Sequence, residues 1–527
     1  MLKNTFSKKQ QTTIKELYDD THNITTVAKN FSEKFKLLTD YKSIENMRKK
    51  ISKYLDSEGL TNNKIRLEDT KEFLEASKRK LDKKKYYIIT WEQNETPLHT
   101  NFWENILTYK EFLDAELSVI LGRYKNPTSV FTDKEHENWN KETQLYWDAS
   151  RHDIHKYLTV LSDVKISPTR KYPLTGIQGL SQGKSIVIGH PKLHLKTEPT
   201  LNGYPKKMLM TTGAVTVPNY TDSGAGAISE GVHKLGFVIV EVESKDIFYI
   251  RQVEADADGN FVDLCYEVKN QEVNKIDKAL GLICGDTHQW QLDQKIDEQN
   301  DKICNYFNVD NVVLHDVSDG DSCNNHIIKS PIKQYERVIK GQNLIEKELE
   351  DTYLWLKGKI KFNPVVVRSN HDERYDRILD QDWRKDIHNS LFYLDYTSKK
   401  LKGEVNIGIL PYFLNKKFGN SIRCLDYIDS FKVGKYECSQ HGDWGSNGSK
   451  GTPASFRNLE LPIILAHTHT PYRADDTFYV GTNTHLILDY NQKGMSSWVQ
   501  ANVLVSKNGI AQHLIFVNGK FTTFEFL

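Results

Sequence analysis

The sequence predicts an α/β fold for most of the chain, preceded by a small all-helical module. From about residue 86 onward, short apolar runs rich in β-branched residues alternate with longer segments of helical periodicity, as strands and helices do in sheet-based folds. The first 57 residues lack such runs and space their apolar residues as helices do. Because single cores stop growing near about 250–300 residues, a chain of 527 residues should form more than one domain.

Three short amphipathic helices are predicted within residues 1–57, which are predominantly basic. Their arrangement resembles a helix-turn-helix of the recombinase or Myb-like kind, with residues 25–29 in the supporting helix and residues 43–54 as the recognition helix. The resemblance implies that the module contacts DNA through basic side chains of its last helix: Arg48, Lys49, Lys50 and Lys53. A basic helical bundle that serves oligomerisation is the alternative.

Residues 58–85 are charged and carry few large apolar groups, which predicts an exposed helical linker. Residues 86–270 are predicted to form a middle α/β domain, which opens with a β-α-β unit. The unit comprises a strand at 86–91, a helix at 101–113 and a strand at 117–121, and further strands are predicted at 185–188, 207–212, 236–243 and 247–253. The sequence does not indicate what this domain does.

Composition and short motifs exclude several classes of protein. Gly183-Lys184-Ser185 resembles the end of a phosphate-binding loop, but Gln178 stands where that motif needs its first glycine, so we expect no nucleotide cofactor. No apolar run approaches the ~18–20 residues needed to cross a bilayer, and the lysine-rich N-terminus has no apolar signal core. We therefore expect a cytoplasmic protein without a membrane partner. Its six cysteines form no C-x-x-C pair, so reduced thiols are expected.

Residues 271–527 contain five polar blocks that end or interrupt apolar runs. The blocks are Asp286-Thr-His288, Asp316-Val-Ser-Asp319, Asn370-His371-Asp372, His441-Gly-Asp443 and His467-Thr-His469, and the runs include 279–284, 311–314, 364–367 and 461–465. Buried strands deliver such side chains to one edge of a sheet. Imidazole and carboxylate donors without cysteine suit divalent ions such as Mn²⁺, Fe²⁺ or Zn²⁺. Seven donors are too many for one ion, so we expect two ions about 3.5–4 Å apart that share an aspartate.

In their residue types and order, these blocks resemble the calcineurin-like metallophosphoesterases over roughly residues 276 to 490. The resemblance implies a four-layer α-β-β-α sandwich and a centre of two divalent ions, with Mn²⁺ expected before Fe²⁺ or Zn²⁺. The implied ligands of the first ion are Asp286, His288, Asp316 and His469, and those of the second are Asp316, Asn370, His441 and His467. Asp316 would therefore bridge the two ions.

The same resemblance implies catalytic roles for two further residues. His371 would be the general acid that protonates the leaving oxygen, and Asp319 would orient it, while metal-bridged hydroxide attacks phosphorus in line. The candidates for substrate contacts are Arg368, Arg374, His315 and Trp444, the last as a surface on which a base stacks.

Three positions depart from the family pattern, because His315, Ser369 and Ala466 stand where it has glycine. Glycine usually permits close packing or an unusual φ, so these departures predict locally different loops in a distant member. All the implied ligands are nevertheless in place.

A DNA-binding module joined to a phosphoesterase core predicts a metal-dependent deoxyribonuclease. Two alternatives remain: an enzyme that hydrolyses a phosphomonoester, a cyclic nucleotide or another small phosphodiester, and a non-catalytic DNA-binding regulator. The three-part arrangement also resembles large tailed-phage proteins, including the pre-early proteins with which T5-like phages degrade host DNA. That resemblance implies a homo-oligomeric Mn²⁺-dependent nuclease acting on DNA in the cytoplasm of a bacterial host.

Overall fold

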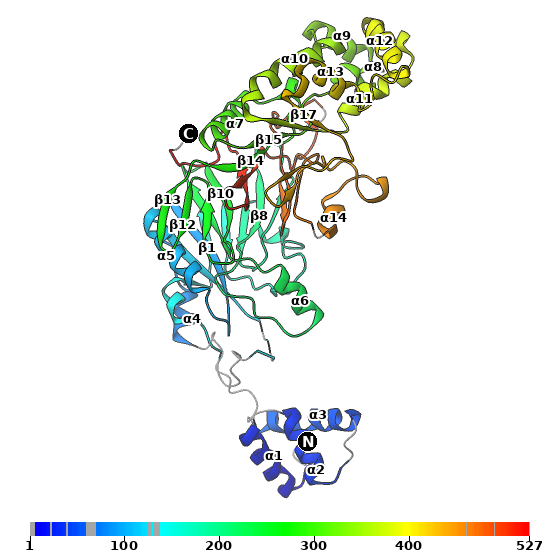
Figure 1. Cartoon of the computed structure of the whole chain (residues 1–527). Helices are drawn as coiled ribbons and strands as arrows, with labels where there is room; N and C mark the ends of the chain where they lie inside the picture. Colours follow the sequence, from blue (N-terminus) through cyan, green and yellow to red (C-terminus); the bar gives the residue numbers. More distant parts are fainter. Residues whose placement is uncertain are drawn as a thin grey trace.

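The computed structural model describes residues 6–21, 24–37, 41–58, 70–124, 126, 128–129, 137–459, 461–489 and 491–525. The described N-terminal residues form three helices, α1 (Lys8–Thr21), α2 (Ile24–Lys34) and α3 (Tyr41–Ser57), as the periodicity predicts (Figure 1). They enclose a core of their own, in which Ile14, Phe31 and Ile51 are fully buried. The three helices therefore share one hydrophobic cluster.

The segment that follows the three helices differs from the predicted exposed linker. Within the described part of 58–85, the helix α4 spans only Lys71–Ala76, and residues 59–69 lie outside the described residues. Ala76 packs against Leu121 and Trp147, and Arg79 pairs with Glu116 at 2.7 Å. These contacts dock the segment onto the sheet, and the α-helix described in the predicted linker is confined to Lys71–Ala76.

Five strands form a sheet with the order β10-β9-β1-β2-β3. They are β1 (Tyr86–Gln93), β2 (Glu116–Gly122), β3 (Trp147–Asp148), β9 (Gly236–Val242) and β10 (Phe248–Glu254). β1 and β2 are parallel neighbours joined by helix α5 (Thr100–Leu113), so the predicted β-α-β unit is present. α5 covers one face of the sheet, where Phe102 and Ile106 pack with Ile88 and Leu117.

Ten strands form the largest sheet, with the order β18-β19-β20-β22-β21-β7-β8-β6-β5-β4. They are β4 (Arg151–His155), β5 (Leu158–Leu161), β6 (Ser185–Ile188), β7 (His194–Glu198), β8 (Lys207–Thr211), β18 (Lys432–Val433), β19 (Tyr436–Glu437), β20 (Ile463–Leu465), β21 (Tyr472–Ala474) and β22 (Thr477–Tyr479). β7 pairs with β21 through Leu195 and Arg473. The sheet therefore crosses the predicted boundary at 270/271, and the ranges 86–270 and 271–527 do not form separate sheets.

A third sheet has the order β17-β16-β15-β14-β23-β24. Its strands are β14 (Ala279–Ile283), β15 (Asn311–Leu314), β16 (Pro364–Val367), β17 (Arg423–Leu425), β23 (Ala501–Ser506) and β24 (Ala511–Ile515). β14 to β17 run parallel to one another. Neighbouring side chains face opposite sides, so Leu282 packs under the helices while Ile283 faces the ten-stranded sheet.

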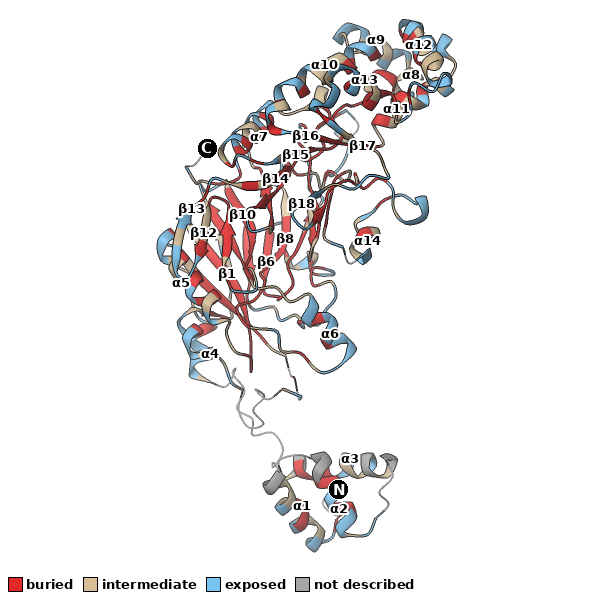
Figure 2. Cartoon of the chain, viewed as in Figure 1, coloured by how far each residue is buried: buried red, intermediate tan, exposed pale blue. Residues whose placement is uncertain are grey.

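Helices cover the outer face of this six-stranded sheet, and the buried strands lie between the layers (Figure 2). The covering helices include α7 (Gln294–Tyr306), α10 (Ile345–Lys359) and α13 (Ile409–Phe418). The remaining described α-helices and strands are α6 (Gly224–Gly231), α8 (Asn325–Ile328), α9 (Pro331–Lys340), α11 (Asp372–Arg377), α12 (Ser390–Leu401), α14 (Pro453–Phe456), β11 (Phe261–Asp263), β12 (Tyr266–Lys269) and β13 (Glu272–Lys275). No described helix is both long and apolar enough to span a membrane.

The predicted α/β class is confirmed, but the layers extend beyond a simple four-layer sandwich. The ten-stranded sheet packs on the six-stranded sheet at one end and on the five-stranded sheet at the other. These two smaller sheets lie side by side, because Gln512 of β24 donates to the carbonyl oxygen of Gln252 in β10 at 3.2 Å. Over β20 and β22 the outer layer is the short helix α14, whose Phe456 packs on Ile463 and Tyr479. Residues 86–270 thus lengthen the sandwich.

Candidate metal centre

The predicted ligands follow the ends of strands in two facing sheets. Asp286, Asp316 and Asn370 follow the parallel neighbours β14, β15 and β16. His441 follows β19, and the pair His467 and His469 follows β20, with β19 and β20 also parallel neighbours. Because the carboxyl ends of parallel strands meet at one sheet edge, the two sheets present these side chains to the same place.

The backbone at this edge is unusual. His288, Asp316, His467 and His469 have φ angles of 42°, 44°, 74° and 54°, in the left-handed region that non-glycine residues rarely occupy. Such strain is retained where the surrounding structure enforces it, and it concentrates at functional sites. The loops therefore give up local backbone stability to point these side chains inward.

Four side chains converge on the first position. Asp286, His288, Asp316 and His469 are buried, and one potential ligand atom from each lies within 4.8 Å of the others. His469 Nε2 is 3.0 Å from Asp286 Oδ2 and 3.2 Å from His288 Nε2. His288 Nε2 is 3.5 Å from Asp316 Oδ2. This cluster, which matches the ligand set expected for the first ion, could hold a metal ion.

The second predicted set lies beside the first and shares Asp316 with it. His441 Nε2 is 3.3 Å from Asp316 Oδ2, the same oxygen that faces His288. His467 Nδ1 is 3.1 Å from Asn370 Oδ1, and the backbone N–H of His467 donates to Asp286 at 3.3 Å. The Oδ2 atom of Asp316 therefore faces one histidine of each predicted set.

Unsatisfied buried atoms test whether the site fits a cation. Asp316 Oδ1 and the Nδ1 atom of His441 are buried without a hydrogen-bond partner among the described residues. Buried polar atoms are nearly always paired, because leaving one unpaired costs free energy. A cation between these atoms would satisfy them, so the donor set fits a divalent metal ion.

The two buried aspartates and two of the histidines shift one another's pKa values. Burial opposes ionisation of Asp286, but His469 and His441 outweigh it and lower the pKa of that carboxyl to about 2. Burial likewise disfavours the charged imidazoles, yet Asp316 and its neighbours raise the pKa of His288 to about 9 and that of His441 to about 10. At neutral pH an incoming metal ion must therefore displace protons from both imidazoles.

Asp319 acts on a different histidine from the one expected. Its carboxylate Oδ1 lies 3.1 Å from His288 Nδ1, so it orients a metal-ligand candidate. His371 Nδ1 instead lies 2.8 Å from the backbone oxygen of Asp319. The expectation that the Asp319 side chain orients His371 is therefore wrong. The reason is that the backbone carbonyl oxygen of Asp319 already accepts the hydrogen bond from His371, while the carboxylate contacts His288.

His371 lies at the open side of the cluster, with its ring centroid 4.4 Å from that of His288. Burial lowers the pKa of His371 well below its usual value, so its resting imidazole is neutral. Arg374 donates to the Nε2 atom of His371 at 3.3 Å and to the carbonyl oxygen of Asp319 at 2.8 Å. His288, Asp319 and His371 also form a second group that could hold a metal ion, which makes a ligand role the alternative for His371.

A cleft of about 710 Å³ opens directly over the cluster. Asp316, His371, His467, His469 and Arg374 line its floor. The opposite wall belongs to helix α9 and contributes the basic residues Lys333, Arg337 and Lys340. Sequence reasoning missed this wall, although the three residues recur at i, i+4 and i+7, which places them on one face of a helix.

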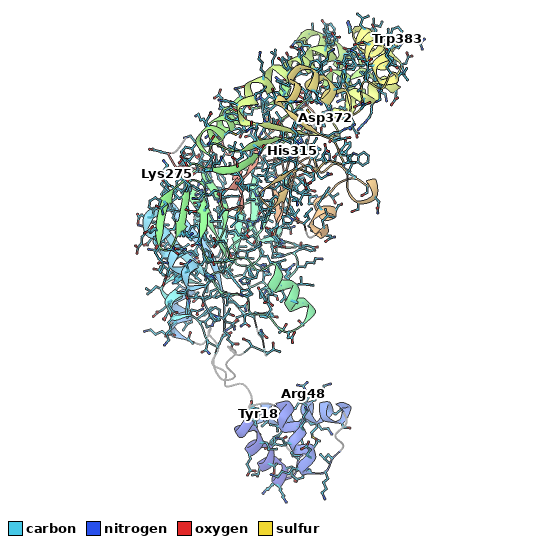
Figure 3. The ribbon with its side chains drawn as sticks, viewed as in Figure 1. Tyr18, Arg48, Lys275, His315, Asp372 and Trp383 are labelled. Carbon is cyan, nitrogen blue, oxygen red and sulfur yellow. The ribbon has the colours of Figure 1, made fainter. Side chains whose placement is uncertain are left out.

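The remaining substrate candidates lie elsewhere. Arg368 does not line the cleft; it pairs with Asp426 at 2.6 Å and lies 4.7 Å from the ring centroid of Tyr427. His315 is fully buried in the interior (Figure 3), and Trp444 is 47% exposed outside the cleft lining. Of the four, only Arg374 faces the cleft, because Arg368 forms an ion pair with Asp426, which follows the neighbouring strand β17.

Comparison with curated proteins finds a relative from a bacteriophage. The chain is 27% identical over 479 residues to Protein A1 of Escherichia phage T5, and the alignment covers 83% of each chain. No model of a known protein family matches the chain. No solved structure matches it either.

Proposed function

We propose that the chain is a metal-dependent phosphodiesterase that cleaves DNA, built on a distant member of the calcineurin-like metallophosphoesterase superfamily. The observation that carries the proposal is the buried Asp and His cluster, whose unpaired atoms converge at the floor of a cleft. Two divalent ions, with Mn²⁺ expected first, would be held by the ligand sets that share Asp316. When bound, such ions supply Lewis-acid activation of water and of the phosphate group.

The protein's own side chains have separate tasks in this proposal. The aspartates and histidines of the two ligand sets would hold the metal ions. The carboxylate of Asp319, whose Oδ1 atom lies 3.1 Å from Nδ1 of His288, orients that imidazole. Arg374, which lines the cleft, holds a phosphate oxygen. A phosphate anion in the cleft raises the pKa of His371, in opposition to the effect of burial. The imidazole can then take up a proton and donate it to the leaving oxygen.

DNA is the proposed substrate because the cleft is open and partly basic. Lys333 and Lys340 are exposed on α9 and form no ion pair among the described residues, so they remain available to phosphates. The relative from a DNA phage is consistent with this substrate, although its name, Protein A1, states no activity. A phage origin would place the protein in the cytoplasm of a bacterial host.

The N-terminal helices are proposed to bind duplex DNA through α3. Lys50 and Lys53 are exposed on that helix, and Arg48 belongs to it (Figure 3). We expect Lys50→Ala with Lys53→Ala to weaken duplex binding and to reduce the slope of log affinity against log salt by about 2, since each lost phosphate contact removes about 0.9. Fluorescence anisotropy of the metal-free chain across a salt series measures this. Lys8→Ala with Lys9→Ala, on α1, is the control, and an equal change in both pairs would contradict the proposal.

Metal removal and add-back tests the proposed activity. Metal-stripped protein should leave labelled duplex and single-stranded DNA intact, and Mn²⁺ should restore cleavage. Mg²⁺ and Zn²⁺ are compared in parallel, and p-nitrophenyl phosphate and bis-p-nitrophenyl phosphate are included as small substrates. Turnover of the small esters alone would replace the nuclease with a small-molecule phosphoesterase. No turnover of any substrate with any metal would leave the regulator as the surviving interpretation.

A further inference from the structure

A second pocket, of about 640 Å³, adjoins the metal cleft. His485 and Ile487 line both spaces, so the segment that carries them forms a boundary shared by the cleft and the pocket. The pocket lies where the ten-stranded sheet faces β10 and β24, and it is lined by Met208 of β8 and Phe248 of β10. Its volume falls within the range of about 300–1,000 Å³ typical of small-molecule sites.

Aromatic and apolar side chains make up much of the pocket wall. Four aromatic rings line the pocket: Tyr157, Tyr204, Phe248 and Phe516. The side chain of Tyr204 is 67% exposed. Exposed rings at the mouth of a pocket offer faces on which a planar heterocycle stacks. Such walls favour a ligand that has a flat ring system.

Among the described residues that line the same pocket, two lysines lack an acidic partner, whereas Asp293 is the one carboxylate without a lysine or arginine partner. Lys206 and Lys295 line the pocket and form no ion pair among the described residues. Lys206 donates to the carbonyl oxygen of Ser496 at 3.3 Å, and burial lowers the pKa of its ammonium group.

The acids that line the pocket are already engaged. Asp246 pairs with Lys156 at 3.1 Å. Asp293 accepts hydrogen bonds from the backbone N–H of Lys295 at 3.1 Å and from Gln500 at 2.9 Å. The pocket therefore suits a ligand that combines an aromatic ring with an anion.

We propose that this pocket holds one nucleotide unit of the strand whose scissile phosphate lies in the metal cleft, with its base against Tyr204 and its phosphate beside Lys206. The inference rests on the proposed nuclease function, and continuity through His485 and Ile487 gives the strand its path. It also gives residues 86–270 a role, because they supply Tyr157, Tyr204, Lys206 and Phe248 to the wall. The lengthened sandwich would then extend substrate binding beyond the reacting phosphate.

The test compares a strand with a small diester in the full-length chain. Tyr204→Ala and Lys206→Met should each raise the KM for a single-stranded pentanucleotide about 10-fold. Stacking one base contributes about 1–3 kcal/mol, or roughly 5- to 150-fold, and Lys206→Met removes a charge-assisted contact with the phosphate. Both variants should hydrolyse bis-p-nitrophenyl phosphate at the wild-type kcat/KM, because that ester does not reach the pocket. Tyr335→Ala on α9 is the matched control, since Tyr335 is also 67% exposed but does not line either space.

The possible outcomes separate the two proposals. Wild-type protein that hydrolyses the small diester but neither cleaves nor binds the pentanucleotide overturns both of them. Wild-type cleavage with an unchanged pentanucleotide KM in both variants overturns the nucleotide pocket and leaves the nuclease intact. A free deoxynucleoside monophosphate that binds wild-type protein but not Tyr204→Ala, with an unchanged pentanucleotide KM, would make this a separate nucleotide site and would likewise overturn the strand path.

Discussion

Replacing Asp316 with alanine is expected to lower Mn²⁺-dependent DNA cleavage by at least about a thousandfold and to reduce the metal content of the protein. Its Oδ2 atom lies 3.5 Å from His288 Nε2 and 3.3 Å from His441 Nε2, so one substitution removes a donor from both ligand sets. Loss of the several kcal/mol that bound metals contribute to charge stabilisation corresponds to three or more factors of ten. Cleavage assays and elemental analysis of the purified variant measure the two effects.

Asp489→Ala is the matched control for this substitution. Asp489 also lines the cleft, but it is exposed and belongs to neither ligand set. Its loss should leave metal content unchanged and alter cleavage by less than a few-fold. Circular dichroism and thermal unfolding establish that both variants fold. A folded Asp316→Ala protein with full activity would disprove the assigned centre.

The same centre should bind metal more tightly as pH rises. His288 and His441, with pKa values raised to about 9 and about 10, hold protons at neutral pH. Raising the pH towards 9 removes these competing protons, so the affinity for Mn²⁺ should increase across pH 6.5–8.5. Isothermal titration calorimetry in two buffers of different ionisation enthalpy measures the protons released. Asp316→Ala should release fewer protons, because the carboxylate that favours both charged imidazoles is gone. An affinity that does not change with pH would contradict this account of the site.

Replacing His371 with alanine is expected to slow DNA cleavage by about 10²–10⁴-fold while leaving the metal content unchanged. This range is typical for the loss of a general acid or base. The distinguishing measurement is bis-p-nitrophenyl phosphate, whose p-nitrophenolate leaves readily without a proton. The variant should therefore hydrolyse this ester at a rate much closer to that of the wild type.

Arg374→Gln provides the comparison for His371→Ala. Arg374 contacts His371 and lines the same cleft, but its proposed role is to hold the phosphate. It should therefore slow both substrates by similar factors. If His371→Ala instead loses metal, then His371 is a ligand in the alternative group with His288 and Asp319, and the general-acid assignment fails.

The sequence alone located several of the strands and the order of the candidate ligands. The runs at 311–314, 364–367 and 185–188 coincide with β15, β16 and β6. Such runs are recognisable because β-branched, apolar composition is a local property of a buried strand. The polar residue that follows a strand is also fixed by local order, so the sequence could indicate that Asp286 and Asp316 would meet at one sheet edge.

Tertiary structure decided the features that depend on distant partners. Arg368 pairs with Asp426, which follows a different strand, and so Arg374 faces the cleft in its place. The Asp319 carboxylate turns to His288 because its own carbonyl already accepts from His371. Neither choice is visible in the spacing of residues along the chain.

The joining of residues 86–270 to the rest of the protein has the same origin. β7 and β21 pair across more than two hundred residues of intervening sequence, through Leu195 and Arg473. Strand composition specifies that a segment will enter a sheet, but the choice of neighbour depends on side-chain packing contributed by both partners. The sequence therefore determined the strands and the chemistry of their ends. Only long-range packing determined which sheet they share and which pocket that sheet forms beside the candidate metal centre.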